Sequence, residues 1–205
     1  MTCYIVGAGE FYGELCPASG DLVIAADGGF DTLAKLGIKP NILIGDMDSI
    51  GDKAEKIGIK FIRHPVEKDE TDSYLAYREG LRLGYRDFRL YGGVGGRPDH
   101  TFANYSLLLG AKNDGCNITL IDKNFEIFVI KNEEVTLIGK EGATFSVFAF
   151  GGDAEGVTVA GAKYTCTDAL LSESFPLGVS NSFLRCDVRI SVTRGALLIM
   201  KETGE

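Results

Sequence analysis

The hydrophobic pattern of this chain changes its period part-way along, and this change constrains the fold more than any other feature. Up to about residue 113, short apolar runs typical of strands alternate with amphipathic segments of helical length. The predicted strands cover residues 4–6, 22–25, 41–44, 60–63 and 88–91, and the predicted helices cover residues 30–36, 71–83 and 101–112. This alternation favours a mostly parallel sheet covered by helices.

From about residue 117 onward the helical period disappears. Runs of β-branched and aromatic residues are separated by glycine and other turn residues, over residues 118–121, 126–130, 135–138, 144–150, 157–159, 188–193 and 196–200. Many short strands of this kind favour an antiparallel sandwich or barrel. We therefore expect an α/β protein, with a Rossmann-like, mostly parallel domain at residues 1–131 and an all-β sandwich domain at residues 132–205.

The composition narrows the class of partner. The chain is 45% hydrophobic and 24% charged, and its 21 Lys and Arg against 29 Asp and Glu give a net charge of −8. Such an acidic balance argues against binding to nucleic acid or to a membrane surface. The chain has no apolar run near the ~20 residues of a membrane-spanning helix, and its first residues lack the basic start of a signal peptide. We expect a cytoplasmic protein.

Polar clusters follow the predicted strands of the first domain. They occupy residues 27–29, 45–49, 67–72 and 92–100. In an open α/β sheet, ligands bind beyond the carboxyl ends of the strands, so we expect these clusters to meet at one edge.

The acidic members of these clusters are spaced for metal binding. Asp46 and Asp48 are two residues apart at a strand end, and Asp69 and Asp72 are three apart at a helix start, so each pair shares a face. Converging carboxylates repel one another, and a hard divalent cation removes that conflict. Ligands that are all oxygen favour Mg²⁺ over zinc. The simpler alternative is that single members cap a helix or close a turn, as could Asp69, Thr71 and Asp27.

Residues 92–96 are glycine-rich and precede a predicted helix. Backbone N–H groups in such a loop can face a phosphate, although a plain turn has the same composition. The loop matches neither the dinucleotide-binding nor the P-loop pattern. Arg97 and Lys68 are the natural phosphate partners among its neighbours. His100 could act as a base or have a structural role.

Taken together, these motifs resemble the thiamine pyrophosphokinase family. The first half carries Asp27-Gly28-Gly29, GDMDS at 45–49, KDETD at 68–72, and GGRPDH at 95–100 followed by Asn104. In the second half, residues 156–163 (GVTVAGAK) with Tyr164, and Gly178-Val179-Ser180-Asn181, resemble the family's thiamine-binding sandwich. The resemblance covers nearly the whole chain.

The resemblance implies transfer of pyrophosphate from ATP to the hydroxyl of thiamine, which gives thiamine diphosphate and AMP. It implies a homodimer in which thiamine binds between one subunit's catalytic domain and the other's sandwich. Catalytic roles fall to Asp46, Asp48, Asp69, Asp72 and Asp99, and the first four of these would hold Mg²⁺. The implied ATP contacts are Asp27, Lys68, Thr71, Gly93 and Arg97, and the implied thiamine contacts are Asp99, His100, Ser180 and Asn181.

One departure concerns the contact to the thiamine ring. Some family members stack a Trp on thiamine, and this chain has none. Phe183 is a possible substitute, although a core position is the favoured interpretation. Two other functions remain open from the residues alone: a pyrophosphokinase with another hydroxymethyl acceptor, such as a pterin, and a non-catalytic sensor of nucleotide or metal.

Overall fold

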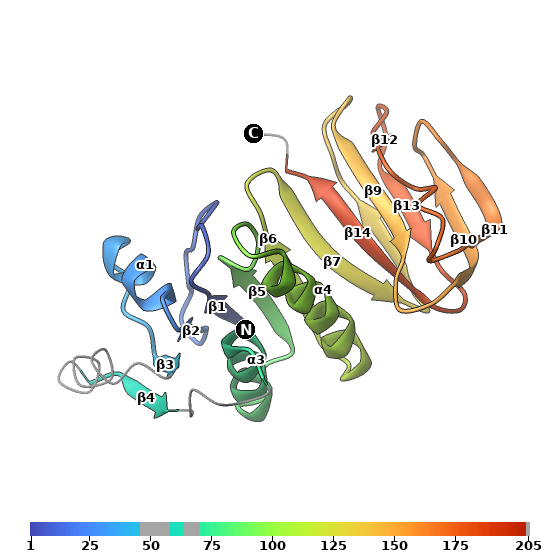
Figure 1. Cartoon of the computed structure of the whole chain (residues 1–205). Coiled ribbons are helices and arrows are strands. Elements are labelled where there is room, and N and C mark those ends of the chain that lie inside the picture. The colour runs from blue at the N-terminus through green and yellow to red at the C-terminus, as the bar shows by residue number, and fades with distance from the viewer. Residues whose placement is uncertain (46–57, 64–69, 204–205) are drawn as a thin grey trace. The chain divides into compact units, whose positions relative to one another are not determined.

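The chain forms two compact units, Met1–Lys123 and Asn124–Glu205. The computed structural model describes residues 1–45, 58–63 and 70–203 (Figure 1). Residues 125–131, which the sequence pattern assigned to the first domain, form strand β7 (Phe125–Lys131). Because β7 pairs with a strand of the second unit along its whole length, the structure divides the chain before β7.

The first unit is built on a parallel sheet, as predicted. Its strand order is β6-β5-β1-β2-β3-β4, and each neighbouring pair is parallel. The strands are β1 (Thr2–Val6), β2 (Leu22–Ala26), β3 (Ile42–Gly45), β4 (Lys60–Arg63), β5 (Asp87–Tyr91) and β6 (Asn117–Ile121). After β1 the chain continues to β2 in the direction of one edge of the sheet, and after β5 it continues to β6 in the direction of the other edge. The switch point of this doubly wound fold therefore lies between β1 and β5.

Helices cover both faces of this sheet. Leu33 of α1 (Gly29–Lys35) is buried in one cluster with Val6 of β1. Gly80 of α3 (Asp72–Arg82) lies against Cys3 and Phe88, so closely that a Cβ there would be 2.6 Å from the Phe88 ring. Since alternate residues of a strand point to opposite faces, α1 and α3 cover opposite faces.

Helix α4 (Pro98–Asn113) packs against β6 (Figure 1). It begins at Pro98 rather than at the predicted residue 101. Proline is well suited to the first helical position, because its fixed φ is helical and the N–H that it lacks would have no partner there. The earlier start brings Asp99 and His100 into the first turn of the helix.

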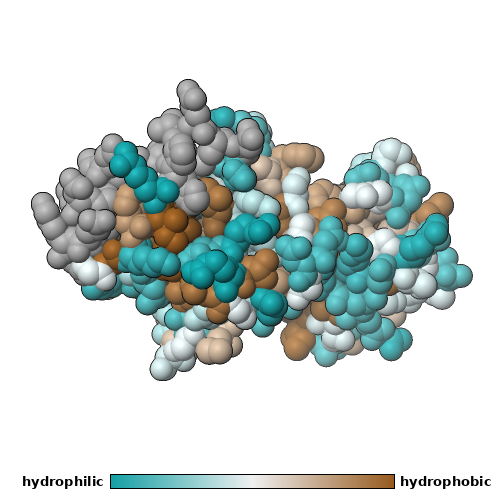
Figure 2. Space-filling model, turned by 90° about the horizontal axis from the view of Figure 1, so that it is seen from below, coloured by the Kyte–Doolittle hydropathy of each residue, from teal (hydrophilic) through white to brown (hydrophobic). Residues whose placement is uncertain are grey.

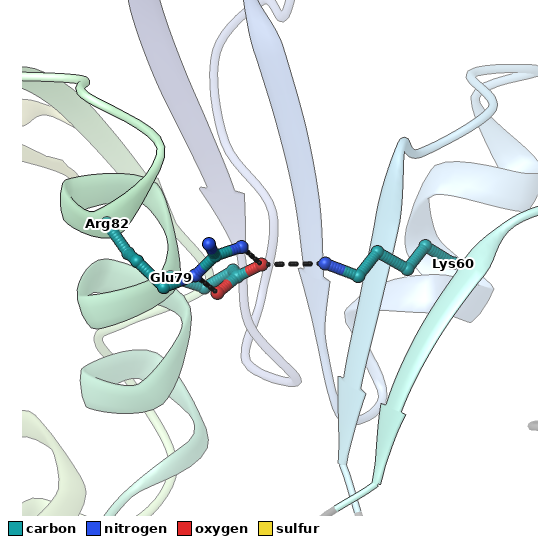
Figure 3. Close-up of polar contacts among 3 residues, drawn as sticks. All are labelled: Lys60, Glu79 and Arg82. Atoms are coloured by element: carbon teal, nitrogen blue, oxygen red, sulfur yellow. Dashed lines mark hydrogen bonds and ion pairs between the residues drawn. The ribbon is translucent and has the colours of Figure 1, made fainter.

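The edge strand β4 is tied to α3 by a cluster of three charged side chains (Figure 3). Glu79 of α3 accepts a hydrogen bond from Lys60 Nζ of β4 at 3.0 Å, and Arg82 donates to both Glu79 oxygens at 2.7 and 2.8 Å. The Arg82 hydrogen bonds are the largest cause that lowers the pKa of Glu79, to about 2. This cluster adds a side-chain attachment to the backbone pairing between β4 and β3.

The second unit contains two antiparallel sheets. One has the order β12-β9-β14-β7 and the other β11-β10-β13-β8. The strands that follow β7 are β8 (Glu134–Leu137), β9 (Thr144–Ala149), β10 (Ala154–Ala160), β11 (Cys166–Leu171), β12 (Asn181–Ser182), β13 (Val188–Ser191) and β14 (Ala196–Glu202). These two sheets confirm the expected all-β architecture after the α/β part of the chain.

The sandwich core consists of the alternate residues that each strand turns inward. Val147 of β9, Ile190 of β13 and Leu197 of β14 all belong to one buried cluster. Phe183 is 1% exposed in this cluster, and its ring centroid lies 5.0 Å from that of Phe145. Phe183 is therefore a core residue.

The surface combines polar and apolar groups. Figure 2 shows hydrophilic side chains over much of one face, interrupted by smaller hydrophobic patches. Within residues 1–45, 58–63 and 70–203, no helix has both the length and the apolar character needed to cross a membrane.

Candidate functional site

The first unit has a cleft of about 560 Å³ at the carboxyl ends of its parallel strands. Loops that follow β1, β2 and β5 line it, together with the first residues of α3 and α4. Ligand clefts of open α/β sheets are expected at this edge, beside the switch point. The structure thus brings together three of the four polar clusters seen in the sequence, including Asp27, Thr71, Asp72, Gly93, Arg97 and His100.

Two glycine-rich loops meet at the switch point. The N–H of Gly7 donates to the carbonyl of Tyr91 at 2.8 Å, and the N–H of Gly9 donates to the carbonyl of Gly92 at 3.0 Å. A Cβ at Gly9 would lie 2.5 Å from the Gly92 oxygen, so only glycine allows this approach. Residues 7–9 were not among the predicted site residues, although a Gly-x-Gly directly after the first strand was a signal for them.

A buried side-chain amide hydrogen-bonds to the loop at residues 92–96. Asn104 of α4 is 6% exposed, and its Nδ2 donates to the carbonyl of Gly93 at 2.7 Å. Gly92, Gly95 and Gly96 have positive φ values of 64°, 79° and 72°, a region that favours glycine. A glycine-rich loop in this conformation can turn its N–H groups toward an anion, because four of its five residues have no side chain.

The first turn of α4 carries three predicted site residues, and two of them, Arg97 and His100, line the cleft. Arg97 forms a two-pronged ion pair with Asp99, Nε to Oδ1 at 3.1 Å and Nη2 to Oδ2 at 2.6 Å. The backbone N–H of His100 also donates to Asp99 Oδ1 at 3.0 Å. The Arg97 hydrogen bond is the largest cause that lowers the pKa of Asp99, to about 2.

The start of α3 supplies Thr71 and Asp72. The Thr71 hydroxyl accepts from the N–H of Tyr74 at 3.2 Å, so Thr71 is the N-cap of α3, the alternative that its position in the sequence had left open. Asp72 lies in the first turn, and both residues line the cleft. The N-termini of α3 and α4 therefore both border the cleft, and their dipoles favour an anionic ligand.

Asp27 borders the cleft from the end of β2. Its φ of 50° is left-handed, which Asp tolerates better than most residues, and its N–H donates to the carbonyl of Ile44 at 2.8 Å. The turn that the sequence suggested at Asp27 is therefore present, and Asp27 also lines the cleft.

Four predicted site residues, Asp46, Asp48, Lys68 and Asp69, lie outside the described residues. Gly45 of β3 is the last described residue before Asp46, and Glu70 is the first described residue after Asp69. Glu70 lines the cleft, and Gly45 packs beside Asp27. Among residues 1–45, 58–63 and 70–203, no group of three His, Cys, Asp or Glu side chains is arranged to hold a metal ion.

The second unit has a pocket of its own, of about 570 Å³. Its lining is mainly apolar, with Val147, Val159 and Leu177 among the walls and the ring of Tyr164 exposed at 61%. An apolar pocket beside an accessible aromatic ring suits a flat, ring-containing ligand.

Two predicted thiamine contacts, Ser180 and Asn181, also line this pocket. Ser180 is exposed and has a φ of 58°, and its backbone N–H donates to Ser146 Oγ at 3.1 Å. Asn181 is 9% exposed, and its amide hydrogen-bonds to the backbone of Tyr164 in both directions, at 3.0 and 2.7 Å. The other predicted thiamine contacts, Asp99 and His100, belong to the first unit.

Fold and sites together define a class of protein: an α/β unit with an anion-suited cleft at the switch point of its sheet, followed by a β-sandwich with an apolar pocket. Family models assign the chain more closely. The thiamin pyrophosphokinase catalytic domain matches residues 15–120, and the thiamin pyrophosphokinase vitamin B1 binding domain matches residues 126–197. The chain therefore belongs to the thiamin pyrophosphokinase family, and the resemblance read from its motifs is confirmed.

Relatives agree with this assignment. The thiamine pyrophosphokinase of Bacillus subtilis (strain 168) is 29% identical over 187 residues, which span 89% of this chain and 87% of that protein. A crystal structure of the Bacillus subtilis enzyme superposes with a TM-score of 0.90 at 28% identity, over 99% of both chains. The Geobacillus thermodenitrificans thiamin pyrophosphokinase has a TM-score of 0.86 at 26% identity, over 100% of this chain and 99% of that one. None of these names supports the pterin or sensor alternative.

Proposed function

We propose that this protein transfers the pyrophosphoryl group of ATP to the hydroxyl of thiamine, giving thiamine diphosphate and AMP. The observation that carries the proposal is the cleft at the β1/β5 switch point, where a glycine-rich loop, two helix N-termini and Arg97 surround one space. Family membership supports thiamine as the acceptor, since the relatives above are named for that activity.

The triphosphate of ATP occupies this cleft. The N–H groups of the loop at residues 92–96 and the N-termini of α3 and α4 favour the phosphate charge. Arg97 provides a planar fork that suits phosphate oxygens, and Lys68 is a second cation for the same charge. Because pyrophosphoryl transfer depends mainly on position and on charge neutralisation, these groups together with a divalent cation suffice without a covalent intermediate.

Asp72, together with Asp46, Asp48 and Asp69, would hold Mg²⁺. The support in the described residues is the donor chemistry: Asp72 and Asp27 both line the cleft, and carboxylate oxygen is the ligand that Mg²⁺ prefers. The ion neutralises charge on the phosphate oxygens when it is bound. The protein residues meanwhile fix the phosphates against the attacking hydroxyl.

Asp99 orients the thiamine hydroxyl rather than removing its proton. Arg97 holds the pKa of Asp99 at about 2, so the carboxylate is ionised at neutral pH but is a weak base. Its role is to direct Arg97 and to accept a hydrogen bond from the thiamine hydroxyl. His100, beside it in the first turn of α4, lines the cleft.

The ring system of thiamine binds in the pocket of the second unit. Tyr164 is the aromatic contact there, because its ring is 61% exposed in the lining while Phe183 is buried in the core at 1%. Apolar residues that line the pocket are also exposed, Leu177 at 64% and Val179 at 58%. Exposed apolar groups of this kind favour burial against a second subunit, so we propose a homodimer that brings this pocket to the partner's cleft.

A coupled assay for AMP tests the reaction. The expected result is AMP release that requires ATP, thiamine and Mg²⁺ together, and a fall of at least about 100-fold in kcat for Asp72→Asn. Gly110→Ala, in open space on α4, is the control and keeps its activity. AMP release that is equal without thiamine, or full activity of Asp72→Asn, would contradict the proposal.

A further inference from the structure

The chain around Tyr164 is not held by regular strand pairing. Tyr164 lies between Gly161, whose φ is 82°, and the start of β11 at Cys166. Tyr164 nevertheless lines the second-unit pocket and is 61% exposed. Irregular surface segments are more mobile than strands, so the place of this residue depends on what fixes its backbone.

The Asn181 side chain fixes that backbone. The N–H of Tyr164 donates to Asn181 Oδ1 at 3.0 Å, and Asn181 Nδ2 donates to the Tyr164 carbonyl at 2.7 Å. The amide thus satisfies both backbone groups of one residue, as a neighbouring strand would. It does so at 9% exposure, where an unsatisfied partner would be costly.

The same amide is connected to the core. Asn181 Oδ1 also accepts from the N–H of Ser182 at 2.8 Å, and the N–H of Lys163 donates to the Ser182 carbonyl at 3.0 Å. The next residues, Ala162 and Phe183, form an isolated β-bridge, and Phe183 is buried at 1%. The segment that carries Tyr164 is therefore joined to the core-anchored residues 181–183 at three points, and the Asn181 amide is the point that holds Tyr164 itself.

The hydrogen-bonding capacity of the amide is largely used in this role. Both acceptor positions of Oδ1 are taken, by Tyr164 and by Ser182, and one of the two Nδ2 protons is taken by Tyr164. A ligand could reach at most the remaining proton. Direct recognition of thiamine by the Asn181 oxygen would therefore require breaking these bonds.

We propose that Asn181 is a positioning residue that holds the Tyr164 ring at the pocket, and that it acts on thiamine through Tyr164. The proposal rests on the proposed function of this pocket as the thiamine site. It assigns ring contact to Tyr164 and backbone support to Asn181, and it makes the effects of the two side chains interdependent.

Amide hydrogen exchange of the full chain, without substrates, tests the support directly. Asn181→Ala is expected to speed exchange of the Tyr164 N–H by about tenfold or more, because its buried acceptor is lost. Ser182→Ala is the matched control: its hydroxyl bonds to the carbonyls of Gly142 and Ala143, so Tyr164 exchange should not change. Unchanged Tyr164 exchange in Asn181→Ala would overturn the proposal.

A second variant covers the case in which Asn181→Ala does not fold. Asn181→Asp keeps an oxygen for the Tyr164 N–H but removes the donor to the Tyr164 carbonyl. The Tyr164 N–H is then expected to stay protected in Asn181→Asp. Exchange of this N–H as fast as in an unstructured peptide would count against the proposal.

Coupling to thiamine is measured by a double-mutant cycle. Asn181→Ala is expected to raise the KM for thiamine by about tenfold in the wild-type background and by less than about twofold in Tyr164→Ala. Equal effects in both backgrounds would mean direct contact and would refute the positioning role. Failure of the proposed function is separate: wild-type protein would then lack thiamine turnover, while the exchange result would stand.

Discussion

Glycine at residue 9 determines how closely the two loops of the first-unit cleft approach each other. We predict that Gly9→Ala raises the KM for ATP about tenfold and lowers the free energy of unfolding by about 1–3 kcal/mol, because its Cβ would lie 2.5 Å from the Gly92 oxygen. Urea unfolding and ATP titration measure the two effects. Wild-type values for both would show that the approach is unimportant.

Gly110→Ala is the matched control for this substitution. Gly110 lies within α4, and a Cβ there has no neighbour within 4 Å. Alanine at this helical position should raise the free energy of unfolding by about 0.5–1 kcal/mol and leave the KM for ATP unchanged.

At the level of single residues, the sequence predicted types of chemistry better than exact roles. Asp27, Asp72 and Arg97 were selected because polar residues follow strands, and all three line one cleft. Residues 7–9 were missed because their importance comes from a backbone-to-backbone approach, for which the Gly-x-Gly after β1 is the one sequence signal and no polar side chain is present. The support that Asn181 gives to Tyr164 could not be predicted either, since it depends on two segments that meet only in the folded sandwich.

Among the elements of the fold, β4 tests how side chains secure an edge strand. We predict that Glu79→Gln lowers the free energy of unfolding by about 1 kcal/mol at pH 7, because Lys60 and Arg82 lose their common carboxylate. Both cations are more than half exposed, so solvent screening keeps the effect small.

The loss should depend on pH with a definite sign. The pKa of Glu79 is lowered from 4.5 to about 2 in the folded protein, so its contribution is full above about pH 4.5 and is lost as the pH falls toward 2. Urea unfolding at pH 7, 4 and 3 should therefore show the wild type and Glu79→Gln converging in acid. A difference that is constant over this range would contradict the assigned role.

Elements with a regular period were predictable, and elements without one were not. Helix α3 was expected over residues 71–83 and is observed at Asp72–Arg82, because its apolar spacing and its Thr71 cap agree. Strand β11 (Cys166–Leu171) was not predicted, because most of its side chains are exposed or half-buried and no alternation marks it. Its existence depends on pairing with β10.

For the whole molecule, the proposed homodimer predicts complementation between two impaired variants at a low thiamine concentration. Asp72→Asn disables the cleft of the first unit, and Tyr164→Ala weakens thiamine binding in the pocket of the second, so that each variant alone turns over slowly at this concentration. Co-expressed mixed dimers would then contain one site with both changes and one with neither, and activity should recover to about a quarter of wild type. Activity no greater than the sum of the two separate variants would contradict a site shared between subunits.

The central claim, pyrophosphoryl transfer to thiamine, is tested most directly by identifying the products. ³¹P NMR of the full chain with ATP, thiamine and Mg²⁺ should show AMP and thiamine diphosphate growing at equal rates as ATP disappears, since both phosphates move in one displacement. ADP and thiamine monophosphate as the products, or ATP consumed with no phosphorylated thiamine, would contradict the claim.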